Sequence, residues 1–143
     1  MKVVQISVFL ENKSGRLYEV SSCLADHGIN IRALCVAETA DYGVLRLIVN
    51  KPAEAREALS RSGFTVSETE VIAVEIPDEP GGLAGALRAL LAENINIEYV
   101  YCFVEKSGES AIVVFRLEEL DRGIRALQSA GYVVMRGEDV YAI

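Results

Sequence analysis

"GINIRAL" at residues 28–34 and "NINIEYV" at residues 94–100 both place an asparagine between two isoleucines. Aligning the chain with itself at an offset of 66 residues superposes these stretches and also places Gly15 on Gly81. Near the end of each half the offset grows to 68. Self-similarity over so long a period indicates two copies of one structural unit. The predicted units are residues 1–70 and 71–143.

Each unit alternates apolar runs of strand type with segments of helical periodicity. In the first unit Leu17, Val20 and Leu24 recur at helical spacing, and Gly28 ends that helix. The predicted elements of the first unit are strand 3–10, helix 15–28, strands 30–38 and 43–50, helix 52–63 and a strand that begins at 64. Those of the second are strand 71–76, a helix carrying Leu83, Ala86 and Leu90, strands 96–105 and 110–117, helix 120–130 and a last segment 132–143.

The resulting order is βαββαβ, which is that of the ferredoxin-like fold. The prediction is therefore an α+β protein of two ferredoxin-like units, packed side by side, with antiparallel sheets and helices on one face. Residues 111–115, "AIVVF", are apolar at every position of an expected inner strand. A strand that is apolar on both sides favours cover on both faces. A homodimer is the predicted cover, and an exposed adhesive sheet is the alternative.

Composition excludes several classes of function. The net charge of −7 argues against a nucleic-acid partner, since phosphate binding needs a basic face. No apolar run approaches the roughly 20 residues of a membrane span, so a cytoplasmic location without membrane contact is expected. Cys23, Cys35 and Cys102 have no ligand spacing and are interpreted as small buried apolar residues, with no metal and no cofactor.

Two turns carry the candidate binding residues. "ENKSGRL" (11–17) and "PDEPGGL" (77–83) each combine a capping residue with glycine just before a helix. Free amides at a helix start attract a carboxylate or a phosphate, and glycine lets the backbone approach it closely. The structural alternative is an ordinary capped turn. For Asn30 and Asn96 the alternative is satisfaction of the preceding helix end.

Helix length decides how a turn and an asparagine combine. A helix of about 13 residues spans about 20 Å, so the turn and the asparagine of one unit lie at opposite ends. If the first helices of the two units pack antiparallel, each turn faces the asparagine of the other unit. The first composite site comprises Asn12, Lys13, Ser14, Gly15, Arg16 and Leu17 with Asn96 and Ile97; the second comprises Asp78, Pro80, Gly81, Gly82 and Leu83 with Asn30 and Ile31.

The pattern D-x-P-G-G-L, followed by a helix and "NINI", resembles the ACT domain, and the match covers both halves of the chain. The resemblance implies a stand-alone regulatory pair that binds an amino acid between its units and acts on a metabolic enzyme or pathway. It also implies that Gly15, Asn30, Gly81 and Asn96 hold family positions. The first unit departs from the pattern, with Asn12 for the usual aspartate and Ser14 for the usual proline.

Charge predicts that the two sites are unequal. Lys13 and Arg16 favour a carboxylate at the first turn, whereas Asp78 and Glu79 disfavour one at the second. The first turn is therefore the expected occupied site, and Asp78 is an alternative partner for an α-ammonium group.

Other candidates leave competing functions open. Arg46 in an apolar strand fits a carboxylate clamp, a position facing an interface, or an edge position with its charge in solvent. Tyr99 and Tyr101 share a strand face that suits a ligand site or packing in the core or at an interface. His27 is the single histidine and has no catalytic companions, so an enzyme is the less favoured alternative and no catalytic residue is predicted. A structural scaffold without a ligand is the other alternative.

Overall fold

The computed structural model describes residues 1–103 and 109–143, which divide into two compact units. The first unit comprises Val4–Thr69 with Tyr141–Ile143, and the second comprises Glu70–Val140 with Met1–Val3. The elements are β1 (Val3–Glu11), α1 (Arg16–Asp26), β2 (Ile31–Glu38), β3 (Tyr42–Val49), α2 (Pro52–Arg61), β4 (Thr65–Pro77), α3 (Gly82–Ala92), β5 (Ile97–Cys102), β6 (Ser110–Leu117), α4 (Leu120–Ser129), β7 (Val133–Val134) and α5 (Gly137–Tyr141).

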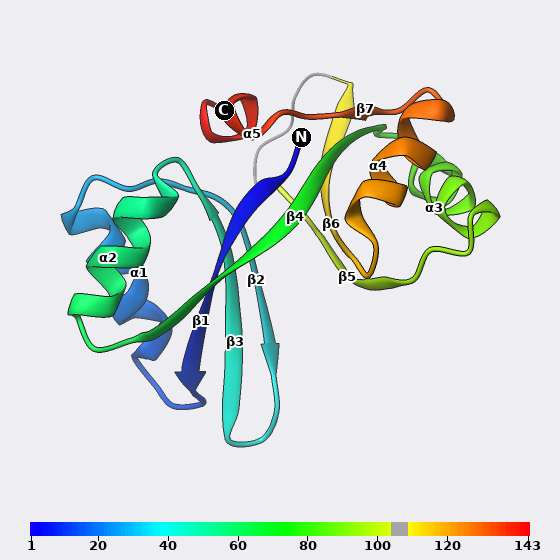
Figure 1. The fold of residues 1–143 in the computed structure, drawn as a ribbon. Helices are drawn as coiled ribbons and strands as arrows, with labels where there is room; N and C mark the ends of the chain where they lie inside the picture. Colours follow the sequence, from blue (N-terminus) through cyan, green and yellow to red (C-terminus); the bar gives the residue numbers. More distant parts are fainter. Residues whose placement is uncertain (104–108) are drawn as a thin grey trace. The chain divides into compact units, whose positions relative to one another are not determined.

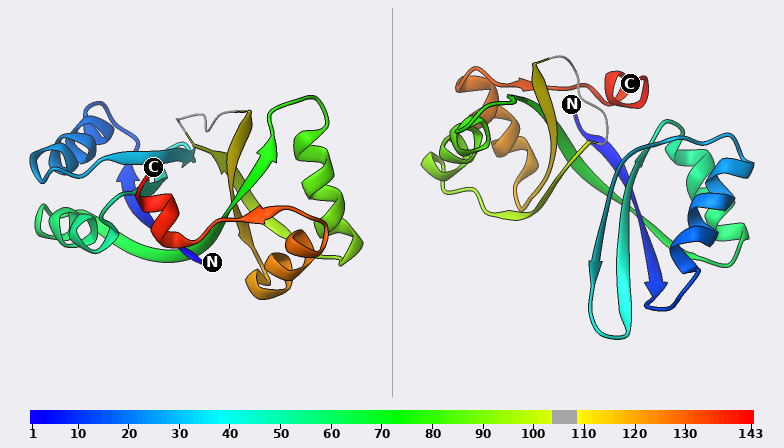
Figure 2. Two further views of the ribbon diagram at one scale, coloured as in Figure 1. Left: turned by 90° about the horizontal axis from the view of Figure 1, so that it is seen from above. Right: turned by 180° about the vertical axis from the view of Figure 1, so that it is seen from behind.

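The strand order of each unit follows the ferredoxin-like pattern. In the first unit the order is β2-β3-β1-β4, and in the second β5 and β7 flank the pair β6 and β4. The β1–β3, β2–β3, β4–β6, β4–β7 and β5–β6 pairs are antiparallel. Helices α1 and α2 lie side by side on one face of the first sheet, as do α3 and α4 on the second (Figures 1 and 2). The predicted α+β class and βαββαβ order are confirmed.

Each unit has its own apolar core between helices and sheet. The first core joins Ile6 and Val8 of β1 to Val20 and Leu24 of α1. The second core joins Ile72, Leu90, Phe115 and Leu127, among others. Alternate residues of β1 and β3 enter the core because side chains on a strand point to opposite faces in turn. These separate cores give each unit an independent hydrophobic contribution to stability.

Strand β4 serves both units. It runs without interruption from Thr65 to Pro77, and the boundary between the units falls inside it, at Thr69 and Glu70. Its first part therefore completes the first unit, and its second part begins the second. The sequence predicted two strands, one beginning at 64 and one at 71–76, but no turn residue separates them.

Several sequence expectations need correction. Leu17 and Leu83 were placed on one helix face with the residues that follow them at helical spacing, but both are exposed, and the buried apolar residues of α1 and α3 begin one turn later. Cys102 is exposed, and Cys23 and Cys35 are partly exposed, so none of the three is a fully buried apolar residue. Residues 104–105 of the predicted strand 96–105 lie outside the described residues.

The homodimer was predicted from the apolar run of strand β6. Ile112 and Val114, on the face of β6 opposite its core residues Val113 and Phe115, are both buried within the single chain. The homodimer itself stays a prediction.

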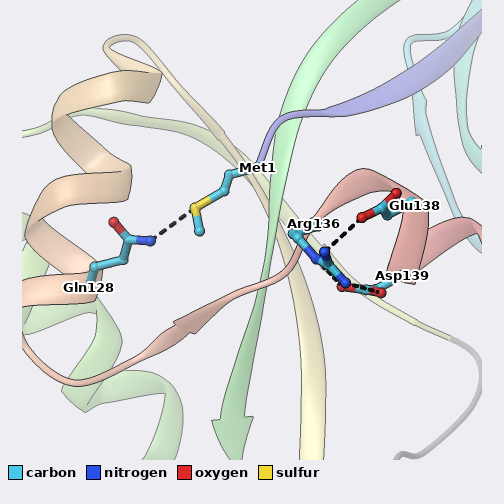
Figure 3. Close-up of polar contacts among 5 residues, drawn as sticks. All are labelled: Met1, Gln128, Arg136, Glu138 and Asp139. Carbon is cyan, nitrogen blue, oxygen red and sulfur yellow. Dashed lines mark hydrogen bonds and ion pairs between the residues drawn. The ribbon is translucent and has the colours of Figure 1, made fainter.

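The last segment, 132–143, is mostly not a strand. Only Val133 and Val134 pair with β4, and Gly137–Tyr141 forms the short helix α5. Within the second unit Arg136 donates to both carboxylate oxygens of Asp139, at 2.8 and 3.0 Å, and pairs with Glu138 at 2.8 Å (Figure 3). The hydrogen bond from Arg136 lowers the pKa of Asp139. These contacts lie at the start of α5, where the βαββαβ order predicted a continued strand.

The two ends of the chain are held by specific contacts. In the second unit Gln128 donates to the sulfur of Met1 at 2.9 Å (Figure 3), and Lys2 pairs with Glu70 at 3.3 Å and with Asp121 at 3.5 Å. In the first unit the backbone N–H of Val4 donates to the hydroxyl of Tyr141 at 2.7 Å. The chain ends are therefore ordered parts of the two units.

Candidate functional site

The first turn is fixed by hydrogen bonds to the β2–β3 hairpin. The backbone N–H of Asn12 donates to the carbonyl of Asp41 at 2.8 Å, and its side-chain amide donates to the carbonyl of Ala40 at 3.1 Å. Gly15 then has a φ of 90°, a left-handed conformation that side chains disfavour, and α1 begins at the next residue. No side chain caps this helix, which corrects the prediction of an Asx or Ser cap.

A cavity of about 170 Å³ lies beside this turn. It is small compared with the roughly 300–1,000 Å³ of pockets for drug-sized molecules, so it suits a ligand of a few heavy atoms. The lining residues come from β1, the turn, α1 and the β2–β3 hairpin: Leu10, Glu11, Asn12, Lys13, Arg16, Leu17, Val36, Glu38 and Gly43.

The cavity lining contains two cationic and two anionic side chains. Lys13 pairs with Glu11 at 3.2 Å, and Glu38 lines the same cavity at the end of β2. Arg16 pairs with Glu19 at 2.6 Å. Opposite charges in one small space match a ligand that itself carries both signs.

Arg16 has a distinct environment. Its guanidinium lies over the ring of Phe64 at 4.9 Å, and only 24% of its side chain is exposed. Among the described residues, its buried Nε has no hydrogen-bond partner. A buried donor without an acceptor is costly, and a ligand oxygen is one group that can satisfy it.

The second turn is built differently. The N–H of Asp78 donates to the carbonyl of Glu109 at 3.0 Å, and Gly81 has a φ of 86°. Gly82, at the repeat position of Arg16, is buried, and a Cβ there would lie 2.1 Å from the carbonyl oxygen of Pro77. Asp78, Pro80 and Gly81 are exposed. No side chain caps α3 either, so the second predicted cap is also wrong.

Asn30 and Asn96 occupy equivalent backbone positions at the far ends of the first helices. The carbonyl of Asn30 accepts from the N–H of Asn50 at 3.1 Å, and that of Asn96 accepts from Glu118 at 3.2 Å. Helix α1 has 11 residues, which corresponds to about 16 Å. Within the first unit, the turn and Asn30 are thus at opposite ends of the helix, and Asn30 does not line the turn cavity.

The structure therefore brings together some of the predicted site residues. Asn12, Lys13, Arg16 and Leu17 share one cavity, whereas Ser14 and Gly15 are exposed in the turn beside it. Ile31 and Ile97 are partly buried against the cores of their units. The pairing of each turn with the asparagine of the other unit stays a prediction.

Sequence reasoning missed the hairpin side of the cavity. Val36, Glu38 and Gly43 reach the turn because Glu38 pairs with Gly43 and Glu11 pairs with Tyr42 at the same end of the sheet. The signal was available in the strand order, since antiparallel neighbours place the end of one strand beside the start of the next.

The remaining candidates lie away from this cavity. Tyr99 and Tyr101 stack with ring centroids 6.4 Å apart, and Tyr101 is buried, which fits packing. Arg46 lies opposite Ser7 and Cys35 in the sheet. The ring Nδ1 of His27 lies 2.8 Å from the carbonyl oxygen of Cys23, so this nitrogen has a hydrogen-bond partner four residues earlier in the chain.

Residues 1–103 and 109–143 contain no group of histidine, cysteine and carboxylate side chains able to hold a metal ion. Within the same residues no helix is long and apolar enough to cross a membrane.

Comparison with known proteins identifies related sequences and structures. The model of the family described as "ACT domain pair" matches residues 1–139. A crystal structure of protein BT0572 from Bacteroides thetaiotaomicron is 42% identical, covers 100% of this chain and 98% of its own, and superposes with a TM-score of 0.94. No curated protein matches the chain.

Regulatory subunits of aspartate kinase share the fold. The subunit from Thermus thermophilus, in its ligand-free form, is 20% identical with a TM-score of 0.65, covering 90% of this chain and 92% of its own. The subunit from Thermus flavus is also 20% identical, with a TM-score of 0.62 and coverage of 89% and 91%. At this level of identity the likeness concerns the fold.

Proposed function

Because the chain belongs to the ACT domain pair family, we propose that it is a non-catalytic cytoplasmic sensor that binds an amino acid and regulates a metabolic enzyme or pathway. The likeness to aspartate kinase regulatory subunits supports a regulatory module and does not identify the target enzyme. The function resides in the site, because one fold supports many functions.

The turn cavity of the first unit is the observation that carries this proposal. A free amino acid is a zwitterion. The cavity offers it positive charge from Lys13 and Arg16 and negative charge from Glu11 and Glu38. The cavity of about 170 Å³ is suited to the charged end of a free amino acid, which has only a few heavy atoms.

We assign the ligand carboxylate to the side of Lys13 and Arg16, and the α-ammonium group to the side of Glu38. The unpartnered Nε of Arg16 gains an acceptor in this arrangement, and charge-assisted hydrogen bonds are stronger than neutral ones. The second turn has Gly82 in place of Arg16 and carries Asp78, so we rank it below the first.

Regulation requires that the ligand bind two arrangements of the protein with different affinities. We propose that a second copy of this chain is the partner whose association differs between the two arrangements. The exposed rings of Phe9 and Tyr42, which lie 5.2 Å apart on the first unit, offer an apolar surface for it. Light scattering after size-exclusion chromatography tests this homodimer, and a monomeric mass contradicts it.

The binding proposal is tested by thermal unfolding with each standard amino acid. A ligand at about 100 times its dissociation constant adds about 2.7 kcal/mol of stability, which raises Tm by about 5–10 °C in a protein of this size. Arg16→Met, which keeps an unbranched apolar stem but removes the guanidinium that lies over Phe64, is expected to abolish the shift. Arg88→Met, at an exposed position of α3, is the matched control and should retain it.

The other outcomes are equally informative. If no amino acid raises Tm, the scaffold alternative replaces the sensor. If Asp78→Ala abolishes the shift while Arg16→Met retains it, the second turn is the occupied site. Loss of the shift in Asn96→Ala would support the predicted contribution of Asn96.

A further inference from the structure

A second cavity of the first unit adjoins the turn cavity. It has a volume of about 250 Å³ and lies between α1 and the sheet. Six of its seven lining residues are leucine, isoleucine or valine: Leu17, Val20, Ile31, Leu34, Leu45 and Leu47. The seventh is Ser21, whose hydroxyl donates to the carbonyl of Tyr18 at 3.0 Å.

Leu17 connects this apolar cavity to the turn cavity because it lines both. On the strand side, Val36 lines the turn cavity and Leu34 lines the apolar cavity. These two residues are two positions apart on β2, so their side chains point to the same face. A molecule held at the turn thus has an apolar surface beside it.

The apolar side chains along this path are accessible to solvent. Leu17 is 48% exposed, Leu34 is 41% exposed and Val36 is 44% exposed. Removing such apolar surface from water is favourable. An apolar group placed over Leu17 would bury part of all three side chains.

The sequence repeat explains why the first unit has this apolar cavity. Ser21 lies one helical turn after Leu17, on the same side of α1. At the repeat position in the second unit stands Leu87, which is partly buried against the core of that unit. The small Ser21 therefore leaves room in the first unit where a leucine side chain fills the equivalent place in the second.

Resting on the amino-acid binding proposed above, we infer that the ligand is an amino acid with a large apolar side chain. Its charged atoms lie in the turn cavity, and its side chain extends over Leu17 into the apolar cavity. Among the side chains that line the apolar cavity, the Ser21 hydroxyl alone is polar, and it already donates to Tyr18, so a charged ligand side chain would lose part of its hydration there with little compensation.

The expected preference follows from the surface that is buried. Each buried methylene contributes about 0.8 kcal/mol, which is about a fourfold gain in affinity. Leucine has three more carbons than alanine, so full burial corresponds to about a 50-fold preference. Because the cavity is partly open, the expected preference for leucine or isoleucine over alanine is about 10- to 50-fold.

Isothermal titration with leucine, isoleucine, methionine, phenylalanine, alanine, serine, lysine and aspartate tests this inference. Ser21→Leu, which gives the first unit the residue of the second, is expected to weaken leucine binding at least about tenfold. It should leave alanine binding within about twofold. Leu87→Ser is the matched control at the repeat position and should leave the preference unchanged. Circular dichroism and Tm show whether each variant is folded.

A second variant protects the test against misfolding of the first. Leu34→Ser, on the exposed edge strand, is expected to reduce the preference for leucine over alanine several-fold, and Val100→Ser, its repeat counterpart, should have no such effect. If small or charged amino acids bind best, or if Ser21→Leu leaves the preference intact, this inference is overturned while the sensor stands. If no amino acid binds, the proposed function itself fails.

Discussion

Gly82→Ala probes how tightly the start of α3 packs. A Cβ at this position would lie 2.1 Å from the carbonyl oxygen of Pro77, whereas ordinary van der Waals contacts begin at 3.4 Å. The obstacle is backbone, so the helix start must move by more than about 1 Å or the variant must retain strain.

Two effects of opposite sign compete in this variant. Alanine in place of glycine within a helix stabilises by up to about 1 kcal/mol when there is space. Overpacking a tight site costs about 1–3 kcal/mol, and here the contact is with an atom that cannot rotate away. We therefore expect a net destabilisation of about 1–2 kcal/mol, or a fall in Tm of about 2–8 °C.

Urea unfolding followed by circular dichroism measures the change in the free energy of unfolding. Ala84→Ser, at an exposed position two residues further along α3, is the control and should change stability by about 0.5 kcal/mol or less. A Gly82→Ala protein as stable as the wild type, or more stable, would refute the close contact with Pro77.

Two further predictions concern the end of the chain. Tyr141→Phe removes the acceptor of the Val4 N–H, and we expect the free energy of unfolding in urea to fall by about 1–2 kcal/mol. Tyr18→Phe, at a largely exposed position, is the control. Equal effects of the two substitutions would contradict the role of Tyr141. Since Arg136 lowers the pKa of Asp139, their pair stabilises the fold above the unfolded-state pKa of the aspartate, and this contribution is lost as pH falls through the lower folded pKa. Arg136→Met should therefore raise the pKa of Asp139 in an NMR titration of its carboxyl group, and an unchanged pKa would show that the hydrogen bond is not formed in solution.

Repetition made the overall architecture predictable. Gly15 and Asn30 recur as Gly81 and Asn96 at one offset. The prediction of each helix or strand in one unit therefore supported the prediction of its counterpart in the other unit. The strand order then followed from the ferredoxin-like topology. The turn residues Asn12, Lys13 and Arg16 were identified because a glycine before a helix is a local signal.

Features that depend on local competition or on distant neighbours were less predictable. The sequence of the last segment is apolar enough for a strand, yet Gly137, Glu138 and Asp139 start a helical turn there. The missed cavity residues Glu38 and Gly43 belong to a hairpin whose position is set by strand pairing. The small size of Ser21 had meaning only when compared with Leu87 in three dimensions.

The continuous strand β4 has a consequence for how the chain can be divided. Cutting between Thr69 and Glu70 would sever a hydrogen-bonded strand, and each half would also lose the terminal residues that its unit takes from the opposite end of the sequence. Neither half is thus a self-sufficient folding module, although the sequence reads as a simple duplication. Because each unit contains residues from both ends of the chain, loss of either copy would remove part of the other, which favours retention of both even after the sequences of their turns diverged.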